Sequence, residues 1–246
     1  MSKELITQEQ QPMAVAIPEN YQAPEMAKED IAIPSIVMWQ KMTDIPEFEG
    51  ENIKPGTFCN PVTGEIYGDK FEAAIISYHV TARIWGDVDK ATGRKTIARF
   101  SSDGIHWDDN GDIINASEFA WREDGKNAVK SYHYLVVIKG NDMPAMLTFK
   151  GASAKNAKKL NSNLYFMRPT WKTWFAFQSK EETTNGNKYY VLTSKPQPKA
   201  ILSPDEAKYC EEIYLSIKGA RITSYEMSAN PEGENESSPS EADNAF

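Results

Sequence analysis

Cysteine is scarce in this sequence, and long apolar runs are missing. The 246 residues include only Cys59 and Cys210, which lie far apart and form no CxxC motif. A disulfide framework is therefore excluded, and a reducing cytoplasm fits best. No stretch approaches the ~18 consecutive apolar residues of a membrane helix, and the first residues lack the basic-then-apolar pattern of a secretory signal. We therefore expect a cytoplasmic protein without membrane contact.

Catalytic and metal-binding motifs are also lacking. The chain has no P-loop, dinucleotide-binding, nucleophile-elbow or HExxH pattern, and His79, His106 and His133 are its only histidines. These do not cluster with the cysteines at the short spacing of a zinc site. Four acids surround His106: Asp103, Asp108, Asp109 and Asp112. A nuclease could hold Mg²⁺ with such acids, but a solvated loop is favoured, and the sequence predicts no enzyme, no metal and no cofactor.

The charge is unevenly distributed along the chain. The net charge is -8, yet residues 1–125 hold 11 Lys and Arg against 22 Asp and Glu, whereas residues 126–225 hold 16 against 7. Residues 226–246 hold six acids and no basic residue. The middle block therefore predicts a local basic field of the kind that a phosphate backbone meets, despite the acidic total.

Composition divides the chain into three parts. Residues 1–30 read as a flexible arm, 31–225 as a single β-rich domain and 226–246 as a disordered acidic tail. Within the domain we expect strands at 73–85, 95–100, 131–139, 145–150, 171–178 and 188–192, and helices at 35–42, at 153–167 and from 203 onward.

Two signals within this domain suggest its architecture. The dipeptide Asn185-Gly186 between polar and then apolar residues predicts a hairpin, and a helix at 153–167 precedes it, with Ala157, Leu160 and Leu164 at helical spacing. A helix before a hairpin suits a mainly β, β-rich α+β fold: an OB-like five-stranded barrel with an inserted helix and a C-terminal helix. A β-sandwich would read similarly.

The densest basic stretch leads into the helix at 153–167, where backbone N–H groups favour an anion. Together with the surplus bases that follow, it supplies the candidate phosphate contacts: Lys150, Ser153, Lys155, Lys158, Lys159, Arg168, Lys172 and Lys188. A solvated helix face that aids solubility is the alternative.

Aromatic residues are interleaved with these lysines, as single-strand binding requires. In residues 171–178, Trp171, Phe175 and Phe177 alternate with a face that carries Lys172 and Trp174. Trp174 is therefore the first candidate for stacking on bases, unless a second layer buries it. The full set of stacking candidates is Trp174, Tyr132, Tyr134 and Tyr189.

The end of the chain combines acids with a last aromatic residue. Glu241 and Asp243 precede Asn244, Ala245 and the terminal Phe246. A disordered acidic segment that ends in Phe suits a partner with a basic rim and an apolar pocket. The tail also has the charge to compete with phosphates for a basic groove.

With this tail and the Lys- and aromatic-rich block before it, the chain resembles single-stranded DNA-binding proteins of bacteriophages. Residues 54–65, Lys-Pro-Gly-Thr-Phe-Cys-Asn-Pro-Val-Thr-Gly-Glu, look like a segment of related phage proteins. The tail departs from the familiar bacterial pattern, because Asn244 and Ala245 separate the acids from Phe246. The resemblance implies a protein of the host bacterial cytoplasm that coats single-stranded DNA and recruits replication or recombination proteins through its tail.

Two other functions stay open at this point. A strand-annealing or recombination mediator would also bind single strands. A phage protein that binds a host protein and no DNA would use the acidic first half as its working surface. The sequence leaves the oligomeric state open, including a homodimer.

Overall fold

The computed structural model describes residues 33–40, 48, 53–91, 95–184 and 186–217. The chain divides into two units, Met1–Ile31 and Ala32–Phe246, and every described residue belongs to the second. Its strands are β1 (Ser35–Met38), β2 (Phe58–Asn60), β3 (Glu65–Gly68), β4 (Lys70–Val88), β5 (Lys95–Ser101), β6 (Ala128–Ile138), β7 (Pro144–Phe149), β8 (Thr173–Thr184) and β9 (Asn187–Ile201). Its helices are α1 (Ala154–Phe166) and α2 (Pro204–Ile217), with short 3-10 turns η3 (Ala116–Phe119), η4 (Gly151–Ser153) and η5 (Thr170–Lys172).

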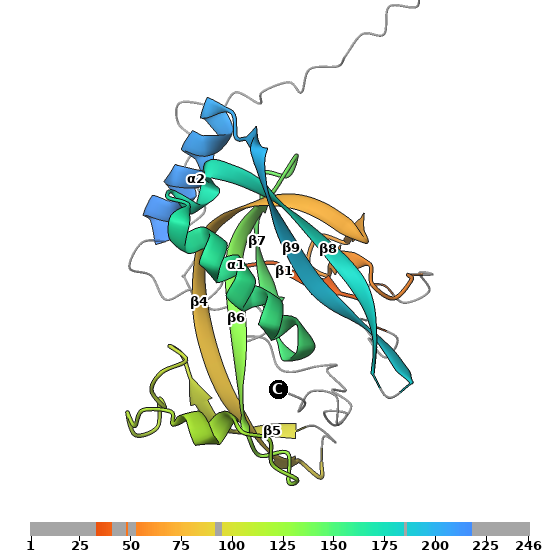
Figure 1. The fold of residues 1–246 in the computed structure, drawn as a ribbon, viewed down its shortest axis with the longest axis vertical. Helices are drawn as coiled ribbons and strands as arrows, with labels where there is room; N and C mark the ends of the chain where they lie inside the picture. Colours follow the sequence, from red (N-terminus) through yellow and green to blue (C-terminus); the bar gives the residue numbers. More distant parts are fainter. Residues whose placement is uncertain (1–32, 41–47, 49–52, 92–94, 185, 218–246) are drawn as a thin grey trace, which may run out of the picture. The chain divides into compact units, whose positions relative to one another are not determined.

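All nine strands belong to one mixed sheet. Their order is β3-β2-β1-β7-β6-β4-β8-β9, with β5 paired to β4. Among the strand pairs of the described residues, only β1 and β7 run parallel. The β-rich α+β class is confirmed, as is the order of a strand meander, an inserted helix, a hairpin and a following helix (Figure 1). The sheet has more strands than the five expected, and its path does not close into a barrel.

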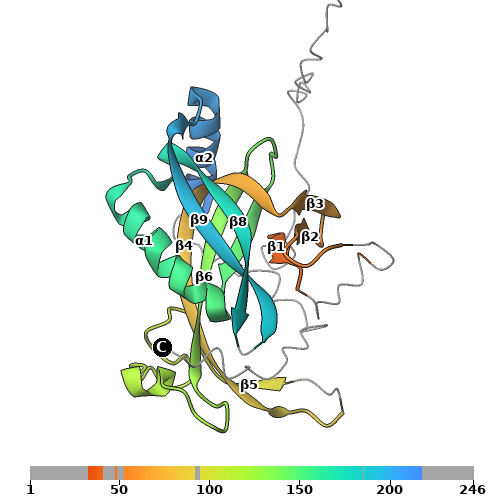
Figure 2. The same cartoon turned by 45° about the vertical axis from the view of Figure 1, so that its right-hand side comes forward.

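A side chain bridges two distant parts of this open sheet. Gln40, two residues after β1, donates from Nε2 to the carbonyl oxygen of Tyr190 in β9 at 2.9 Å. Its Oε1 accepts from the Tyr190 N–H at 3.1 Å. One amide side chain thereby takes the place of a neighbouring strand, which is consistent with the closeness of β1 and the β8–β9 hairpin in Figure 2.

The two faces of the sheet carry separate apolar cores. Adjacent strand residues point to opposite faces, so Ile75 belongs to the first core and Ala74 to the second. α1 covers the first core with the three residues that helical spacing predicts: Ala157, Leu160 and Leu164. α2 covers the second core and buries Cys210. Both cysteines are free and buried.

A third, smaller core lies under the insert, which we define as residues 102–127 between β5 and β6. Trp107 is 1% exposed and packs with Ala82, Ile114 and Ala128. Its indole N–H donates to Glu118 at 3.1 Å, and the Arg99 guanidinium lies 4.5 Å from the ring centroid. The insert therefore has its own apolar anchor on the outer part of β4 and β6.

Most expected elements are confirmed, and one is wrong. The expected strand at 131–139 lies between β4 and β7 as β6, and the capping box that starts α2 is formed by Ser203 and Glu206. The expected helix at 35–42 is wrong over its described part, because Ser35–Met38 is a strand. Its Ile-Val pair suits a strand, and β7 and β2 offer the backbone partners that a short helix would lack.

Candidate nucleic-acid interface

Helix α1 is fixed to β9 by two polar side chains at its start. The Leu192 N–H donates to Ser153 Oγ at 2.9 Å, and Asn156 Nδ2 donates to the Leu192 carbonyl at 2.9 Å. Ser153 is 7% exposed. Its prediction as a phosphate contact is therefore wrong, because its hydroxyl satisfies a buried backbone donor and positions the helix.

This attachment creates a cationic pocket between α1 and the β8–β9 hairpin. The pocket has a volume of about 430 Å³. Its lining consists of Lys155, Asn156, Lys159, Lys180, Glu182, Thr193 and Ser194. Three lysines and one glutamate leave it a net positive charge. We call it the three-lysine pocket.

The ion pairs in the three-lysine pocket are unequal. Lys155 Nζ lies 2.9 Å from Glu182, and Lys180 Nζ lies 3.9 Å from the same carboxylate. The Lys180 side chain is 67% exposed. Within the described chain, Lys159 has no carboxylate within ion-pair distance, so its ammonium stays available to a ligand.

At its other end α1 exposes two aromatic rings. Tyr165 is 69% exposed and Phe166 is 83% exposed, and their ring centroids lie 5.1 Å apart. The Arg168 guanidinium lies 6.0 Å from the Tyr165 centroid. At a rise of about 1.5 Å per residue, about 16 Å of helix separates Lys155 from Phe166. No acidic residue occurs in α1, so its solvent side is basic, polar and aromatic throughout.

Three of the four predicted stacking residues are buried, and their prediction is wrong. Trp174 is 3% exposed, because α2 forms a second layer over its face of β8. Tyr132 and Tyr134 are 8% and 0% exposed and belong to the core under α1. Tyr189 is half-buried, and its hydroxyl lies 3.1 Å from Thr184 Oγ1. None of the three buried rings can present a face to a base in this conformation.

The predicted phosphate contacts fall into separate groups. Lys155 and Lys159 share the three-lysine pocket. Lys158 is exposed on α1, and Arg168 follows the helix. Lys188 pairs with Glu181 at 2.8 Å. Lys150 precedes η4, and Lys172 ends η5. A single lysine channel floored by rings is therefore not formed, and the basic surface that remains follows α1.

Sequence reasoning missed three residues of this surface. Lys180 reaches the pocket from β8, so only the fold reveals its contact with α1. Tyr165 and Phe166 directly follow Leu164, the last residue of the buried stripe. Helical spacing places these two positions off the stripe, and this signal could have identified them as exposed.

The buried His133 stacks on the half-buried His79. Their rings lie on β4 and β6 with centroids 4.7 Å apart. The His133 nitrogens lie 2.9 Å from the hydroxyls of Thr81 and Thr148. Desolvation, together with the nearby His79, Arg83 and Lys150, lowers the pKa of His133 to about 3. Both imidazoles are therefore neutral at pH 7, since burial also lowers the pKa of His79.

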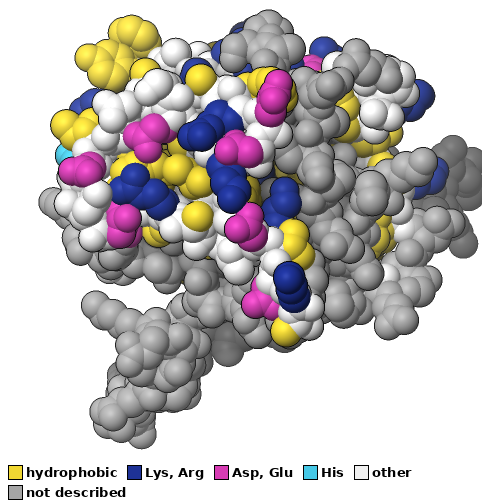
Figure 3. Space-filling model, turned by 90° about the horizontal axis from the view of Figure 1, so that it is seen from below, with side chains coloured by type: hydrophobic (Ala, Val, Ile, Leu, Met, Phe, Trp, Pro, Cys, Tyr) yellow, Lys and Arg dark blue, Asp and Glu magenta, His cyan; other side chains and the backbone are white. Residues whose placement is uncertain are grey.

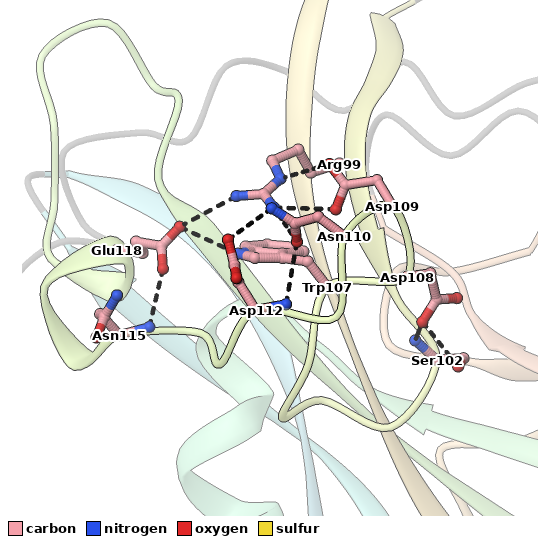
Figure 4. A network of polar contacts seen from close by, with 9 residues as sticks. All are labelled: Arg99, Ser102, Trp107, Asp108, Asp109, Asn110, Asp112, Asn115 and Glu118. Atoms are coloured by element: carbon pink, nitrogen blue, oxygen red, sulfur yellow. Dashed lines mark hydrogen bonds and ion pairs between the residues drawn. The ribbon is translucent and has the colours of Figure 1, made fainter.

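The acids of the insert serve its local structure (Figure 4). Arg99 donates to Asp109 at 2.9 and 3.1 Å. Asn110 donates to Asp112 at 2.6 Å. Asp108 accepts from the backbone N–H and the hydroxyl of Ser102, both at 3.0 Å. Each of these carboxylates holds a turn or an arginine, as expected for a solvated loop.

Asp103 completes this set of acids. Its Oδ2 lies 2.8 Å from His106 Nδ1, and hydrogen bonds from His106 hold the pKa of Asp103 well below its usual range. Over the residues that the structure describes, no three His, Cys, Asp or Glu side chains converge as metal ligands would.

Basic and acidic side chains are interspersed at the end of the molecule that carries β5 (Figure 3). Lys126 pairs with Asp87 at 2.9 Å, as Arg99 does with Asp109. Arg99 and Lys126 at this end are therefore each paired with a neighbouring acid, whereas Lys159 on α1 has no such partner among the described residues.

Fold and site together define a β-rich α+β protein with a cationic pocket and exposed rings along one helix. Residues 8–223 match the family model described as Pam3 phage gp34-like protein, and the chain belongs to this phage protein family. No curated protein and no solved structure matches the chain. None of the described helices has the length and apolar character to span a membrane.

Proposed function

We propose that this phage protein binds single-stranded DNA without sequence preference, along the solvent side of α1. The observation that carries the proposal is the arrangement on this helix. Lysines at its start share a pocket, and exposed aromatic rings stand at its end. Single-strand binders combine these two elements, since ammonium groups follow the phosphates and aromatic rings stack on bases.

The spacing of the two elements supports a short stretch of strand. The distance of about 16 Å along α1 accommodates a few nucleotides of extended single strand. Arg168 beside Tyr165 adds a cation at the aromatic end.

The cellular part of the proposal follows from the sequence. The protein would act without catalysis in the cytoplasm of the infected bacterium during replication or recombination. Its tail, with Glu241, Asp243 and Phe246, would recruit partner proteins. The tail and the arm at 1–30 lie outside the described residues.

Fluorescence anisotropy with a labelled dT oligonucleotide of about 20 nucleotides tests DNA binding. We expect micromolar or tighter affinity at low salt, with a slope of log K against log[salt] of about -2 if three phosphates are neutralised along α1 and at Arg168. A duplex of equal length should bind more weakly, because its paired bases cannot stack on Tyr165 and Phe166. No binding at low salt would overturn the proposal and favour a phage protein that binds a host protein through its acidic first half.

A strand-annealing mediator is the second candidate with single-strand binding. It would accelerate the pairing of two complementary oligonucleotides at saturating protein, whereas a coating protein would slow it. A fluorescence-quenching annealing assay distinguishes the two functions on the same preparation.

A further inference from the structure

One acidic side chain occupies the three-lysine pocket. Glu182 contributes its carboxylate from β8, and its side chain is only 22% exposed. Lys155 Nζ lies 2.9 Å from it, Lys180 Nζ lies 3.9 Å away, and the Tyr189 hydroxyl lies 3.5 Å away. The carboxylate thus binds the cations that a ligand of the pocket would have to use.

A carboxylate and a phosphodiester can bind to the same lysines of the pocket. Both are oxyanions that accept charge-assisted hydrogen bonds from ammonium groups. The pocket, at about 430 Å³, has room beyond the carboxylate, and Lys159 on its wall has no carboxylate partner within the described chain. A phosphate that enters the pocket would meet Lys159 directly and would gain Lys155 only when Glu182 moves away.

We propose that the three-lysine pocket is a subsite for one internal phosphodiester of a bound single strand, and that Glu182 is its competitor within the protein. This inference rests on the proposed function. It adds that the protein binds single-stranded DNA more weakly than it would without Glu182, because each binding event must break the Lys155–Glu182 ion pair.

The neighbouring residue provides a matched control. Glu181 carries the same charge on the same strand and also pairs with a lysine, Lys188, at 2.8 Å. Its side chain is 41% exposed, and it does not line the pocket. Glu181→Gln and Glu182→Gln therefore change the total charge equally, and only the second frees a cation inside the pocket.

The test compares the two variants by anisotropy with the labelled dT oligonucleotide across a salt series. We expect Glu182→Gln to bind about five- to tenfold more tightly at low salt. Its slope should be steeper by up to about 0.7, because binding no longer releases a carboxylate that takes up a cation from solution. Glu181→Gln should stay within about twofold of the unmodified protein, as a general charge effect would allow. Equal gains in both variants, or weaker binding by Glu182→Gln, would overturn the inference.

Two further measurements assign the gain to the pocket. In Lys155→Gln/Glu182→Gln the gain should largely disappear, since coupled residues are non-additive. A full gain there would show that Lys155 is not the cation released. A gain confined to 5′-phosphorylated oligonucleotides would overturn the internal phosphodiester in favour of a strand end. If Glu182→Gln does not fold by circular dichroism, Glu182→Ser supplies the same comparison.

Failure of this inference and failure of the proposed function give different results. If the unmodified protein binds dT and the two glutamate variants behave alike, only the role of Glu182 is lost. If the unmodified protein and all variants fail to bind at low salt, DNA binding itself is lost.

Discussion

The insert after β5 and the surface of α1 are both rich in charge, but they use it in opposite ways. In the insert, Asp109 holds Arg99 and Asp103 holds His106. Helix α1 contains no acid. Its Lys155 and Lys159 share one pocket with Lys180 and Glu182 of β8. Charged side chains that pair with neighbours in the insert hold the conformation of that loop. Charged side chains that face solvent without a partner can bind a ligand.

This comparison also explains why counts of charged residues along the sequence do not identify a binding site. The insert is strongly acidic and α1 is strongly basic, so both appear as candidate sites. The two regions differ in the partners of their charged side chains, and partners such as Lys155 and Glu182 lie 27 positions apart in the sequence. The four predictions below test the contrast between the two regions.

The largest effect should come from the anchor of the insert. Trp107→Ala removes a ring that is 1% exposed and leaves a cavity. Such truncations cost about 3–5 kcal/mol, so urea unfolding should shift to much lower denaturant. Affinity for dT, measured where the variant is still folded, should stay within twofold. A large loss of affinity would mean that the insert takes part in binding.

The exposed rings of the two regions should differ in their effect on affinity. Phe166→Ala removes a ring that is 83% exposed on α1, and Trp121→Ala removes one that is 47% exposed in the insert. Loss of a stacked ring costs about 1–3 kcal/mol of binding. In anisotropy titrations we expect this loss of binding free energy for Phe166→Ala and no loss for Trp121→Ala. An equal loss at Trp121 would place the strand elsewhere.

The buried histidine should make the fold sensitive to acid. Because the pKa of His133 is about 3 in the folded chain against about 6.5 when unfolded, the unfolded chain binds a proton that the folded chain does not. Stability should therefore fall as the pH drops below about 6.5, by at most about 1.4 kcal/mol per pH unit for this group.

Urea unfolding between pH 7 and pH 4.5 measures this acid sensitivity. His133→Gln should lower the slope of stability against pH, whatever its stability at pH 7. His79, whose pKa burial also lowers, accounts for part of the remaining slope. An unchanged slope in the variant would contradict the burial of a neutral His133.

The smallest effect should come from single lysines. Lys159 lines the pocket, whereas Lys126 in the insert is paired with Asp87 of β4 at 2.9 Å. Lys159→Gln should weaken dT binding a few-fold and reduce the salt slope by about 0.7. Lys126→Gln should leave the slope unchanged in the same salt series. Equal changes would indicate a diffuse electrostatic field rather than a site.

The sequence predicted the fold where one physical signal dominated. Apolar β-branched and aromatic runs marked β4 and β6, the stripe of Ala157, Leu160 and Leu164 marked α1, and turn chemistry marked the β8–β9 hairpin. The strand β1 was missed, because four residues offer no period that separates strand from helix. Its state is decided by pairing with β7, which lies more than 100 residues away.

The site was predicted less well, and Trp174 shows why. Alternation along β8 correctly placed it opposite Phe175 and Phe177. Whether that face meets water depends on α2, which follows 30 positions later and covers it. Periodicity reports which residues share a face, but the burial of that face is a property of the tertiary structure.

The bonds that Gln40, Ser153 and Asn156 make to Tyr190 and Leu192 have a consequence for self-association. They occupy N–H and carbonyl groups along the free border of β9, where an intruding strand from another copy would otherwise attach. Another copy of the chain therefore cannot extend the sheet through these N–H and carbonyl groups of Tyr190 and Leu192. Any contact between two copies at this part of β9 has to be made by side chains.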